Sequence, residues 1–373
     1  MHAGSPASDR NGIVIDSRWL ATGLGTYTYN LVAGLKAMGT LRITAVTMPK
    51  HESTLAPLCD QIKMVSAPMY SVREQVEMLL AVGNQRLLHV PHYNVPLGYR
   101  GTLLVTIHDL THLLDKTFRT TWKSRLYARP MLKLAASKAE YIFTVSEYSK
   151  RQMVEHLDVP AGKIEVAYNG VSSAFQPQPH LHAREETGRA YGFDGPYILY
   201  VGNLKPHKNV AGLIRAFAVL RDRESLDHKL VIVGDDVLGA PELKRMVADA
   251  NLEAKIVFVP SVAIDRLPSL YSGADLTVLP SFEEGFGLPI LESMACGTPV
   301  ACSSAASMPE VAGDAAEYFD PHQTDSIAQA IESVLLSSER HEQLRTRGIA
   351  QAAQFTWEAS VKKHYAVYKG FLN

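Results

Sequence analysis

The sequence predicts an α/β protein built from two Rossmann-like, doubly wound domains. Strand-like apolar runs alternate with helix-like segments in both halves of the chain, a pattern typical of parallel sheets. The 373 residues exceed what one typical core holds. Residues 172–180, rich in Ser, Gln and Pro, interrupt the alternation and predict a linker. We therefore expect one domain over residues 1–172 and a second over residues 173–356.

The elements of the first half follow from short apolar runs, which predict strands, and from longer runs with helical spacing. The predicted strands are 12–16, 41–48, 87–90, 103–107, 141–145 and 164–167, and the predicted helices include 26–38 and 149–156. In the second half, strands are predicted at 197–201, 230–233, 256–259, 276–279 and 299–301, with helices between them. The segment 357–371 is predicted to be helical. Two such domains place a ligand at the carboxyl ends of the strands, in a cleft between the domains.

Composition excludes several classes of protein. The net charge of −1 gives no global attraction to nucleic acid. Cys59, Cys296 and Cys302 lack metal-ligand spacing and indicate reduced thiols rather than a disulfide framework. No apolar run reaches the length of a membrane-spanning helix. We expect a cytoplasmic protein, or one held at the inner face of the membrane from outside the bilayer.

The most informative segment runs from Ser281 to Glu292. Two carboxylates, Glu284 and Glu292, stand eight positions apart around a Gly-Phe-Gly turn that follows a buried strand and opens a helix. The backbone N–H groups of such a turn and the positive helix end attract a phosphate. The donor-binding residues expected here are Gly285, Phe286, Gly287 and Leu288. Because carboxylates on either side accept hydrogen bonds from hydroxyls, the segment predicts a sugar-nucleotide site. A lone E-G-x-G would more often be an ordinary strand–helix turn.

The longer pattern E-G-F-G-L-P-x-x-E resembles the E-x7-E motif of retaining glycosyltransferases of the GT-B type, in particular glycosyltransferase family 4. The resemblance implies that Glu284 contacts hydroxyls of the transferred sugar and that Glu292 binds the ribose. It also implies that residues 357–373 return to the first domain. The matching motifs span roughly residues 13 to 311, in the order of the family.

Two motifs of the first half fit this interpretation. Gly23 and Gly25 lie in a loop between the first strand and the first helix, and Thr28 stands where a dinucleotide fingerprint needs a third glycine. The loop resembles the G-x-G loop of the family, although it could also serve only as a tight turn. His108 and Asp109 end a predicted strand and resemble the His-Asp pair of the family, in which the histidine lies beside the donor sugar. Asp109 is expected to orient the ring or to bind the acceptor, with a general-base role as the less supported alternative.

The third motif follows the first strand of the second half. Lys208 matches the family's lysine, which implies that it neutralises the departing diphosphate. Asn203 stands where many members have an arginine, and Lys205 or a protonated His207 could supply the second cation.

We therefore expect a metal-independent, front-face hexosyltransferase with no cofactor, which uses a nucleoside-diphosphate sugar, preferably a GDP-linked mannose or deoxyhexose. The resemblance favours mannosyl- and rhamnosyltransferases of surface-polysaccharide assembly. The acceptor is expected to be a saccharide or a lipid-linked oligosaccharide. Residues 116–139 hold seven Lys or Arg and no Asp or Glu, with aromatic residues interleaved. They fit an anionic membrane surface and equally a solvated face. The alternatives are a nucleotide-sugar epimerase and an inactive sugar-nucleotide-binding partner protein.

Overall fold

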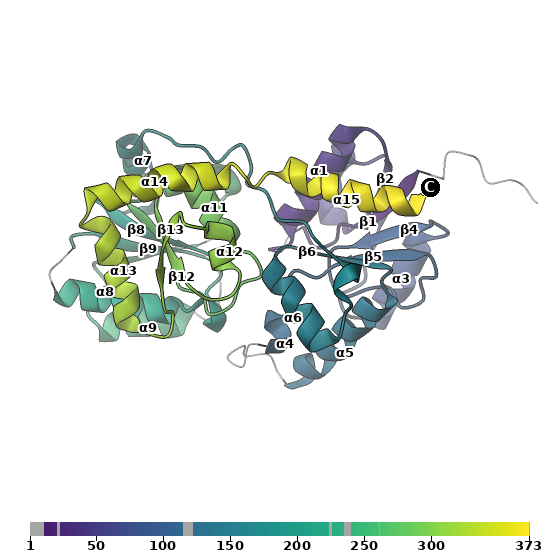
Figure 1. Ribbon diagram of the computed structural model, residues 1–373, viewed down its shortest axis with the longest axis horizontal. Helices are drawn as coiled ribbons and strands as arrows, with labels where there is room; N and C mark the ends of the chain where they lie inside the picture. Colours follow the sequence, from purple (N-terminus) through teal and green to yellow (C-terminus); the bar gives the residue numbers. More distant parts are fainter. Residues whose placement is uncertain are drawn as a thin grey trace, which may run out of the picture. The chain divides into compact units, whose positions relative to one another are not determined.

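The computed structural model describes residues 11–20, 23–114, 122–223, 226–234, 240–260 and 262–372. Residues 1–10, 21–22 and 115–121 lie outside these ranges, and with them the first part of the basic segment 116–139. The chain divides into two compact units (Figure 1). Of the described residues, unit 1 holds those between 11 and 113, 122 and 170, and 357 and 372. Unit 2 holds Leu114 and those between 171 and 356.

Unit 1 contains one parallel sheet in the order β3-β2-β1-β4-β5-β6-β7. Its strands are β1 (Gly12–Asp16), β2 (Arg42–Thr47), β3 (Gln61–Met64), β4 (Leu87–Val90), β5 (Thr102–Thr106), β6 (Tyr141–Thr144) and β7 (Ile164–Val166). Its helices are α1 (Gly25–Met38), α2 (Glu52–Leu55), α3 (Val72–Val82), α4 (Thr111–Leu114), α5 (Trp122–Lys138), α6 (Glu147–Leu157) and α15 (Trp357–Leu372). Every predicted strand of this half is confirmed, and β3 is an edge strand that the sequence did not reveal.

Unit 2 contains a parallel sheet in the order β10-β9-β8-β11-β12-β13. Its strands are β8 (Tyr197–Val201), β9 (Lys229–Val233), β10 (Ile256–Val259), β11 (Leu276–Leu279), β12 (Val300–Ser303) and β13 (Ala316–Phe319). Its helices are α7 (His180–Tyr191), α8 (Val210–Asp222), α9 (Ala240–Asp249), α10 (Leu267–Ser272), α11 (Leu288–Ala295), α12 (Met308–Ala312), α13 (Thr324–Leu335) and α14 (Ser338–Ala352). The edge strand β13 was not predicted.

Helices cover both faces of the unit 2 sheet, so its strands are apolar on both sides. Alternate residues of β8 and β9 enter two separate cores. Ile198, Tyr200, Leu230 and Ile232 pack with α8, α9 and α13, whereas Leu199, Val231 and Val233 pack with α10. The doubly wound architecture is thereby confirmed for this unit.

A buried polar chain joins α15 to the sheet of unit 1. The Tyr27 hydroxyl lies 2.7 Å from Thr106 Oγ1 and 2.7 Å from His364 Nε2. His89 Nε2 lies 2.8 Å from the same Thr106 oxygen, and the Tyr368 hydroxyl lies 2.6 Å from His89 Nδ1. The chain therefore links α1, β4, β5 and α15 through side chains that are almost fully buried.

The strand orders place one topological switch point in each sheet. In unit 1 the order reverses between β1 and β4, and in unit 2 it reverses between β8 and β11. Loops leaving the carboxyl ends of two such strands diverge and leave a crevice, where ligands of open α/β sheets bind. In each unit, the two loops at this point are where ligand-binding residues are expected.

Candidate functional site

The switch point of unit 2 brings Lys208 and Glu284 together. Lys208 lies in the loop after β8 and Glu284 in the loop after β11, on either side of the reversal. Lys208 Nζ lies 2.5 Å from Glu284 Oε1. Their side chains are 16% and 12% exposed, so both charged groups are largely shielded yet reachable from solvent.

Asn209 fixes the position of Lys208. Its backbone adopts a left-handed φ of 54°, and its Oδ1 accepts from Gly212 N at 3.2 Å, which caps α8. Its Nδ2 donates to the carbonyl of Pro280 at 3.0 Å and to that of Pro321 at 2.8 Å. One buried amide thus ties the loop after β8 to the loop after β11, and this tie sets the spacing of the two candidate residues.

Two serines hold Glu284 from the other side. The Ser281 hydroxyl donates to Glu284 Oε1 at 3.1 Å, and the Ser307 hydroxyl donates to the Glu284 carbonyl at 2.9 Å. Ser307 was not predicted as a site residue, because it lies 23 positions beyond Glu284 in the sequence. Because Ser281 and Lys208 both hold Oε1 while Ser307 holds the backbone carbonyl, the carboxylate is oriented before any ligand arrives.

The glycine turn ends at the start of α11. Gly287 has a φ of 88° and is the N-cap of this helix, a conformation that other residues adopt only with strain. Pro289 follows in the first turn, which holds no acidic residue. Gly285 and Phe286 are buried, and Phe286 packs edge-on against Phe355, whereas Leu288 is partly exposed. The geometry therefore favours an anion at this helix end.

Glu292 lies within α11 and has a partner that the sequence did not indicate. The buried Tyr271 hydroxyl donates to Glu292 Oε2 at 2.8 Å. Burial raises the pKa of Glu292 to about 7, and the hydrogen bond from Tyr271 opposes that rise. The carboxyl group is therefore poised to accept or donate a hydrogen bond near neutral pH.

The three remaining residues of the loop after β8 differ in exposure. Asn203 and Lys205 are exposed, and the Asn203 carbonyl accepts from the Tyr200 hydroxyl at 2.7 Å. His207 is buried, and its carbonyl accepts from Phe282 N at 2.8 Å. Of the two cations suggested in place of the arginine, Lys205 is the one that reaches solvent.

Unit 1 carries His108 and Asp109 after β5. The His108 ring stands edge-on to Tyr27, with 4.7 Å between centroids, and burial lowers its pKa to about 4 although Asp109 opposes the shift. The imidazole is therefore neutral near pH 7 and acts as a hydrogen-bonding group rather than a cation. Asp109 Oδ1 accepts from Thr111 N at 2.9 Å, which orients the carboxylate after β5.

Gly23, which precedes α1, and Gly25, its first residue, have different roles. A Cβ on Gly25 would lie 2.0 Å from the Leu20 carbonyl oxygen, so close approach of the backbone requires glycine there. Gly23 is exposed, and a Cβ would meet nothing within 4 Å. Gly25 is therefore required by the close approach of the backbone, whereas the position of Gly23 has room for a side chain.

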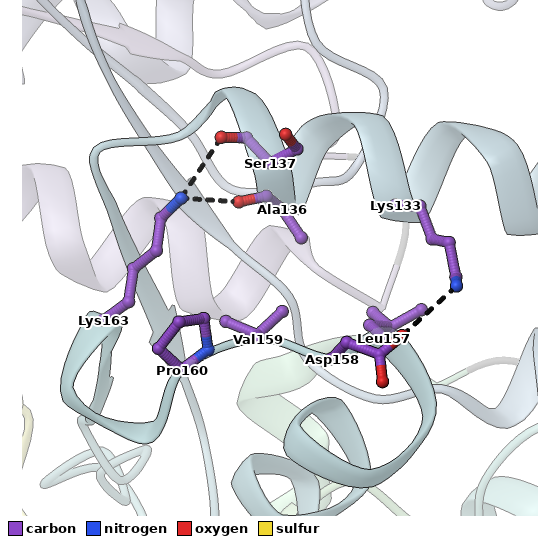
Figure 2. Close-up of a pocket in the computed structure, with 8 residues that line it drawn as sticks. All are labelled: Lys133, Ala136, Ser137, Leu157, Asp158, Val159, Pro160 and Lys163. Carbon is purple, nitrogen blue, oxygen red and sulfur yellow. Dashed lines mark hydrogen bonds and ion pairs between the residues drawn. The ribbon is translucent and has the colours of Figure 1, made fainter.

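A hollow of about 400 Å³ lies between α5 and α6 (Figure 2), and its lining does not include any of the predicted site residues. Its lining precedes β6 and β7, at the amino edge of the sheet. Lys163 donates to the carbonyls of Ala136 and Ser137 at 2.8 and 3.2 Å, and Lys133 pairs with Asp158 at 3.5 Å. Lys163 therefore binds carbonyl groups at the end of α5 and Lys133 forms an ion pair, so both lysines have structural contacts within unit 1. Among the described residues, no His, Cys, Asp and Glu side chains group as metal ligands do.

The chain is similar to known proteins in its sequence and in its fold. Residues 21–175 match the model described as Glycosyltransferase Family 4, and residues 184–351 match Glycosyl transferases group 1. The chain is 32% identical to O-antigen chain mannosyltransferase B of Escherichia coli over 288 residues, covering 76% of this chain and 74% of that protein. It is 30% identical to O-antigen chain mannosyltransferase RfbU of Salmonella typhimurium over 266 residues, covering 71% and 69%.

Among solved structures, sucrose-phosphate synthase from Thermosynechococcus elongatus matches with a TM-score of 0.80 at 21% identity, over 96% of this chain and 98% of that one. Anabaena HepE in complex with UDP and glucose matches with a TM-score of 0.80 at 17% identity, over 96% and 99%. These likenesses show the GT-B fold.

Proposed function

This chain belongs to glycosyltransferase family 4, and from that premise we propose that it is a retaining hexosyltransferase of surface-polysaccharide synthesis. The proposed donor is a nucleoside-diphosphate sugar, with GDP-mannose or a GDP-deoxyhexose preferred. The proposed acceptor is a hydroxyl of a saccharide or of a lipid-linked saccharide. Support for the hexose comes from the relatives, whose names describe O-antigen mannosyltransferases.

The observation that carries the proposal is the Lys208–Glu284 pair beside the amino end of α11. A diphosphate at that helix end would meet a cation, and a sugar attached to it would meet a carboxylate. Lys208 would exchange its contact with Glu284 for the phosphate oxygens, where the negative charge grows as the sugar departs. Glu284 would then accept hydrogen bonds from the sugar hydroxyls, and Glu292 from the ribose.

In the proposed reaction, the acceptor oxygen forms a bond to the anomeric carbon on the face from which the diphosphate leaves. The bond between the anomeric carbon and the phosphate oxygen breaks, and that oxygen takes the acceptor proton. This front-face course needs no metal and no protein nucleophile. Neutral His108 would position the sugar by a hydrogen bond, and Asp109 would bind the acceptor.

The test is a donor screen followed by product analysis. Thermal shift across GDP, UDP, ADP, GDP-mannose and UDP-glucose selects the donor, because a ligand that binds the folded state raises apparent stability. Transfer predicts that an acceptor accelerates nucleoside-diphosphate release and that NMR shows an α linkage. An isomerised donor without acceptor would instead identify an epimerase. Binding without turnover would identify an inactive partner protein.

We also propose that unit 1 rests on an anionic membrane surface. On α3, Val72, Val76 and Leu80 are 84%, 54% and 78% exposed, one helical turn apart, while Glu74 faces inward. Residues 61–139 hold eleven Lys or Arg and four Asp or Glu in a chain of net charge −1. Exposed aliphatic side chains within a stretch of sequence that carries net positive charge suit anionic lipid.

The part of α5 whose side chains are described contributes less to this surface than its sequence suggested. Met131 and Leu132 are buried in unit 1, whereas Arg129 and Lys133 are exposed. Among the described residues, no helix is long and apolar enough to cross a bilayer.

Co-sedimentation with vesicles tests the membrane proposal. The protein should bind phosphatidylglycerol vesicles and not phosphatidylcholine vesicles, and replacing Val72, Val76 and Leu80 with serine should abolish binding. The control Leu336→Ser changes an exposed leucine of unit 2. The proposal would be overturned if the wild type did not bind vesicles but formed a dimer, and if the triple variant lost that dimer.

A further inference from the structure

The switch point of unit 1 carries an aromatic cluster that the proposed donor site does not use. Trp19 follows β1, Tyr70 precedes α3, and His92 and Tyr93 follow β4. The Trp19 and His92 rings stack with centroids 4.0 Å apart, and the His92 and Tyr93 centroids lie 4.1 Å apart. Tyr70 stands edge-on to Trp19 at 5.9 Å. These four side chains are called the aromatic platform.

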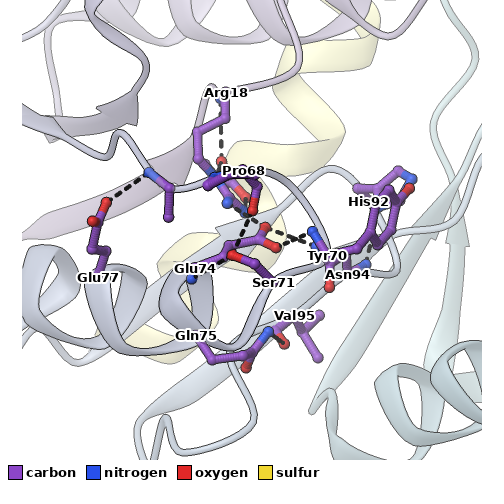
Figure 3. Close-up of polar contacts among 12 residues, drawn as sticks. Arg18, Pro68, Tyr70, Ser71, Glu74, Gln75, Glu77, His92, Asn94 and Val95 are labelled. Atoms are coloured by element: carbon purple, nitrogen blue, oxygen red, sulfur yellow. Dashed lines mark hydrogen bonds and ion pairs between the residues drawn. The ribbon is translucent and has the colours of Figure 1, made fainter.

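Tyr70 is the exposed member of the platform. It is 48% exposed, whereas Trp19 beneath it is 7% exposed. Its φ of 63° lies in the left-handed region, which costs a residue with a side chain about 1 kcal/mol or more. Such a conformation persists where the surroundings enforce it, and such sites are often functional. Here the Glu74 carboxylate accepts from the Tyr70 backbone N–H, and the Ser71 hydroxyl donates to the Pro68 carbonyl at 2.7 Å (Figure 3).

A buried ion network lies under the platform. The Arg18 guanidinium donates to both carboxylate oxygens of Asp16, at 2.8 and 2.7 Å, and to Glu74. Asn94 Nδ2 donates to the same Glu74 oxygen at 2.8 Å. All four residues are at most 2% exposed. Because a buried ion pair adds little net stability over apolar packing, its effect here is to fix positions. It joins the loops after β1 and β4 to the start of α3, which are the segments that present the platform.

The platform reaches the candidate residues of unit 1 through Tyr93. Burial raises the pKa of Tyr93, the Tyr70 side chain opposes the rise by a hydrogen bond, and the charge of Asp109 adds to it. Tyr93 therefore hydrogen-bonds to the Tyr70 side chain and lies close enough to Asp109 for its charge to act on the phenol. The exposed Tyr70 ring is thus bordered by the Tyr93 hydroxyl group at the carboxyl edge of the sheet.

We propose that the aromatic platform binds a pyranose unit of the acceptor saccharide, with the exposed face of Tyr70 stacked on the sugar. A pyranose has an apolar C–H face and a rim of hydroxyls, which match a tyrosine ring bordered by polar groups. A phosphate fits less well, because the Arg18 cation below the platform is buried and paired with Asp16 and Glu74. The proposal rests on the proposed function, since it assigns the acceptor side of the same reaction.

The experiment compares Tyr70→Ala with Tyr29→Ala, which removes a similarly exposed tyrosine from α1. Loss of one stacking contact should raise the acceptor KM about tenfold, which corresponds to about 1.4 kcal/mol. The donor KM and the slow release of nucleoside diphosphate without acceptor should not change, and Tyr70→Trp should restore the acceptor KM. An unchanged acceptor KM in Tyr70→Ala would overturn the proposal, as would a rise in donor KM alone.

A second readout separates this proposal from the proposed function. Saturation-transfer NMR with methyl α-mannopyranoside measures sugar binding whether or not turnover occurs. Signal in the wild type and in Tyr29→Ala, with loss in Tyr70→Ala, supports the platform even if no donor is consumed. Equal signal in the wild type, Tyr29→Ala and Tyr70→Ala, or no signal in the wild type, would count against sugar binding by the platform.

Discussion

Replacing Lys208 with methionine removes the ammonium group and keeps an unbranched side chain of similar length. The ammonium lies 2.5 Å from Glu284, and both side chains are more than four-fifths shielded. Removing one partner leaves a partly buried carboxylate, which should cost about 1–2 kcal/mol, less than for a fully buried pair. Stabilisation of a developing charge by one positioned group contributes about 2.7–4 kcal/mol to a transition state. Turnover should therefore fall about 100- to 1000-fold.

The assays are urea unfolding of the ligand-free protein and nucleoside-diphosphate release with donor and acceptor. Lys229→Met is the matched control, because Lys229 pairs with Asp194 at 2.6 Å at the amino end of β9. It should change unfolding by less than about 1 kcal/mol and leave turnover intact. A Lys208→Met variant that keeps more than about a fifth of wild-type turnover would refute the assigned role, given the expected loss.

Three further predictions concern other parts of the molecule. Tyr271→Phe removes the hydrogen bond to Glu292 and should raise the pKa of Glu292 above its value of about 7. Nucleotide affinity should therefore fall about tenfold at pH 7 and recover above about pH 8. Calorimetry across this pH range measures the affinity, and a loss that does not depend on pH would contradict the prediction. Burial lowers the pKa of His364 to about 4, so this residue contributes stability that is present above the unfolded pKa of about 6.5 and falls by about 2 kcal/mol between pH 6.5 and 5. In urea unfolding, His364→Gln should remove this share of the pH dependence and leave that of His108, whose pKa is also lowered to about 4. Gly25→Ala should cost about 2 kcal/mol or more because its Cβ meets a backbone carbonyl, whereas Gly23→Ala should unfold like the wild type.

The sequence predicted the central strands because they are continuous apolar runs. Both strands it did not reveal lie at sheet edges. In β3, Gln61–Met64, two of the four residues are partly buried and two are exposed, and in β13, Ala316–Phe319, the middle two are only partly buried. An edge strand needs fewer apolar residues, so its hydrophobic pattern is weak.

For the candidate site, the sequence predicted residues whose chemistry lies within one loop, such as Glu284 and Gly287. It could not predict their supports. Tyr271 reaches Glu292 from α10, and Asn209 reaches the Pro321 carbonyl 112 positions away. Such contacts depend on which strands are neighbours in the sheet. The spacing of residues in the sequence does not reveal this strand order.

The buried chain from Tyr27 to Tyr368 has a consequence for biosynthesis. Unit 1 begins at the amino end, yet Tyr368 and His364 arrive only after the segment 171–356 has been made. Until then, the polar groups of His89 and Thr106 lack their α15 neighbours and stay accessible to water. Apart from Leu114, the described part of unit 2 lies within that segment, so unit 2 can complete its fold without α15, whereas unit 1 cannot. A chain that stops after residue 356 should thus keep a protease-resistant unit 2 and lose protection in unit 1.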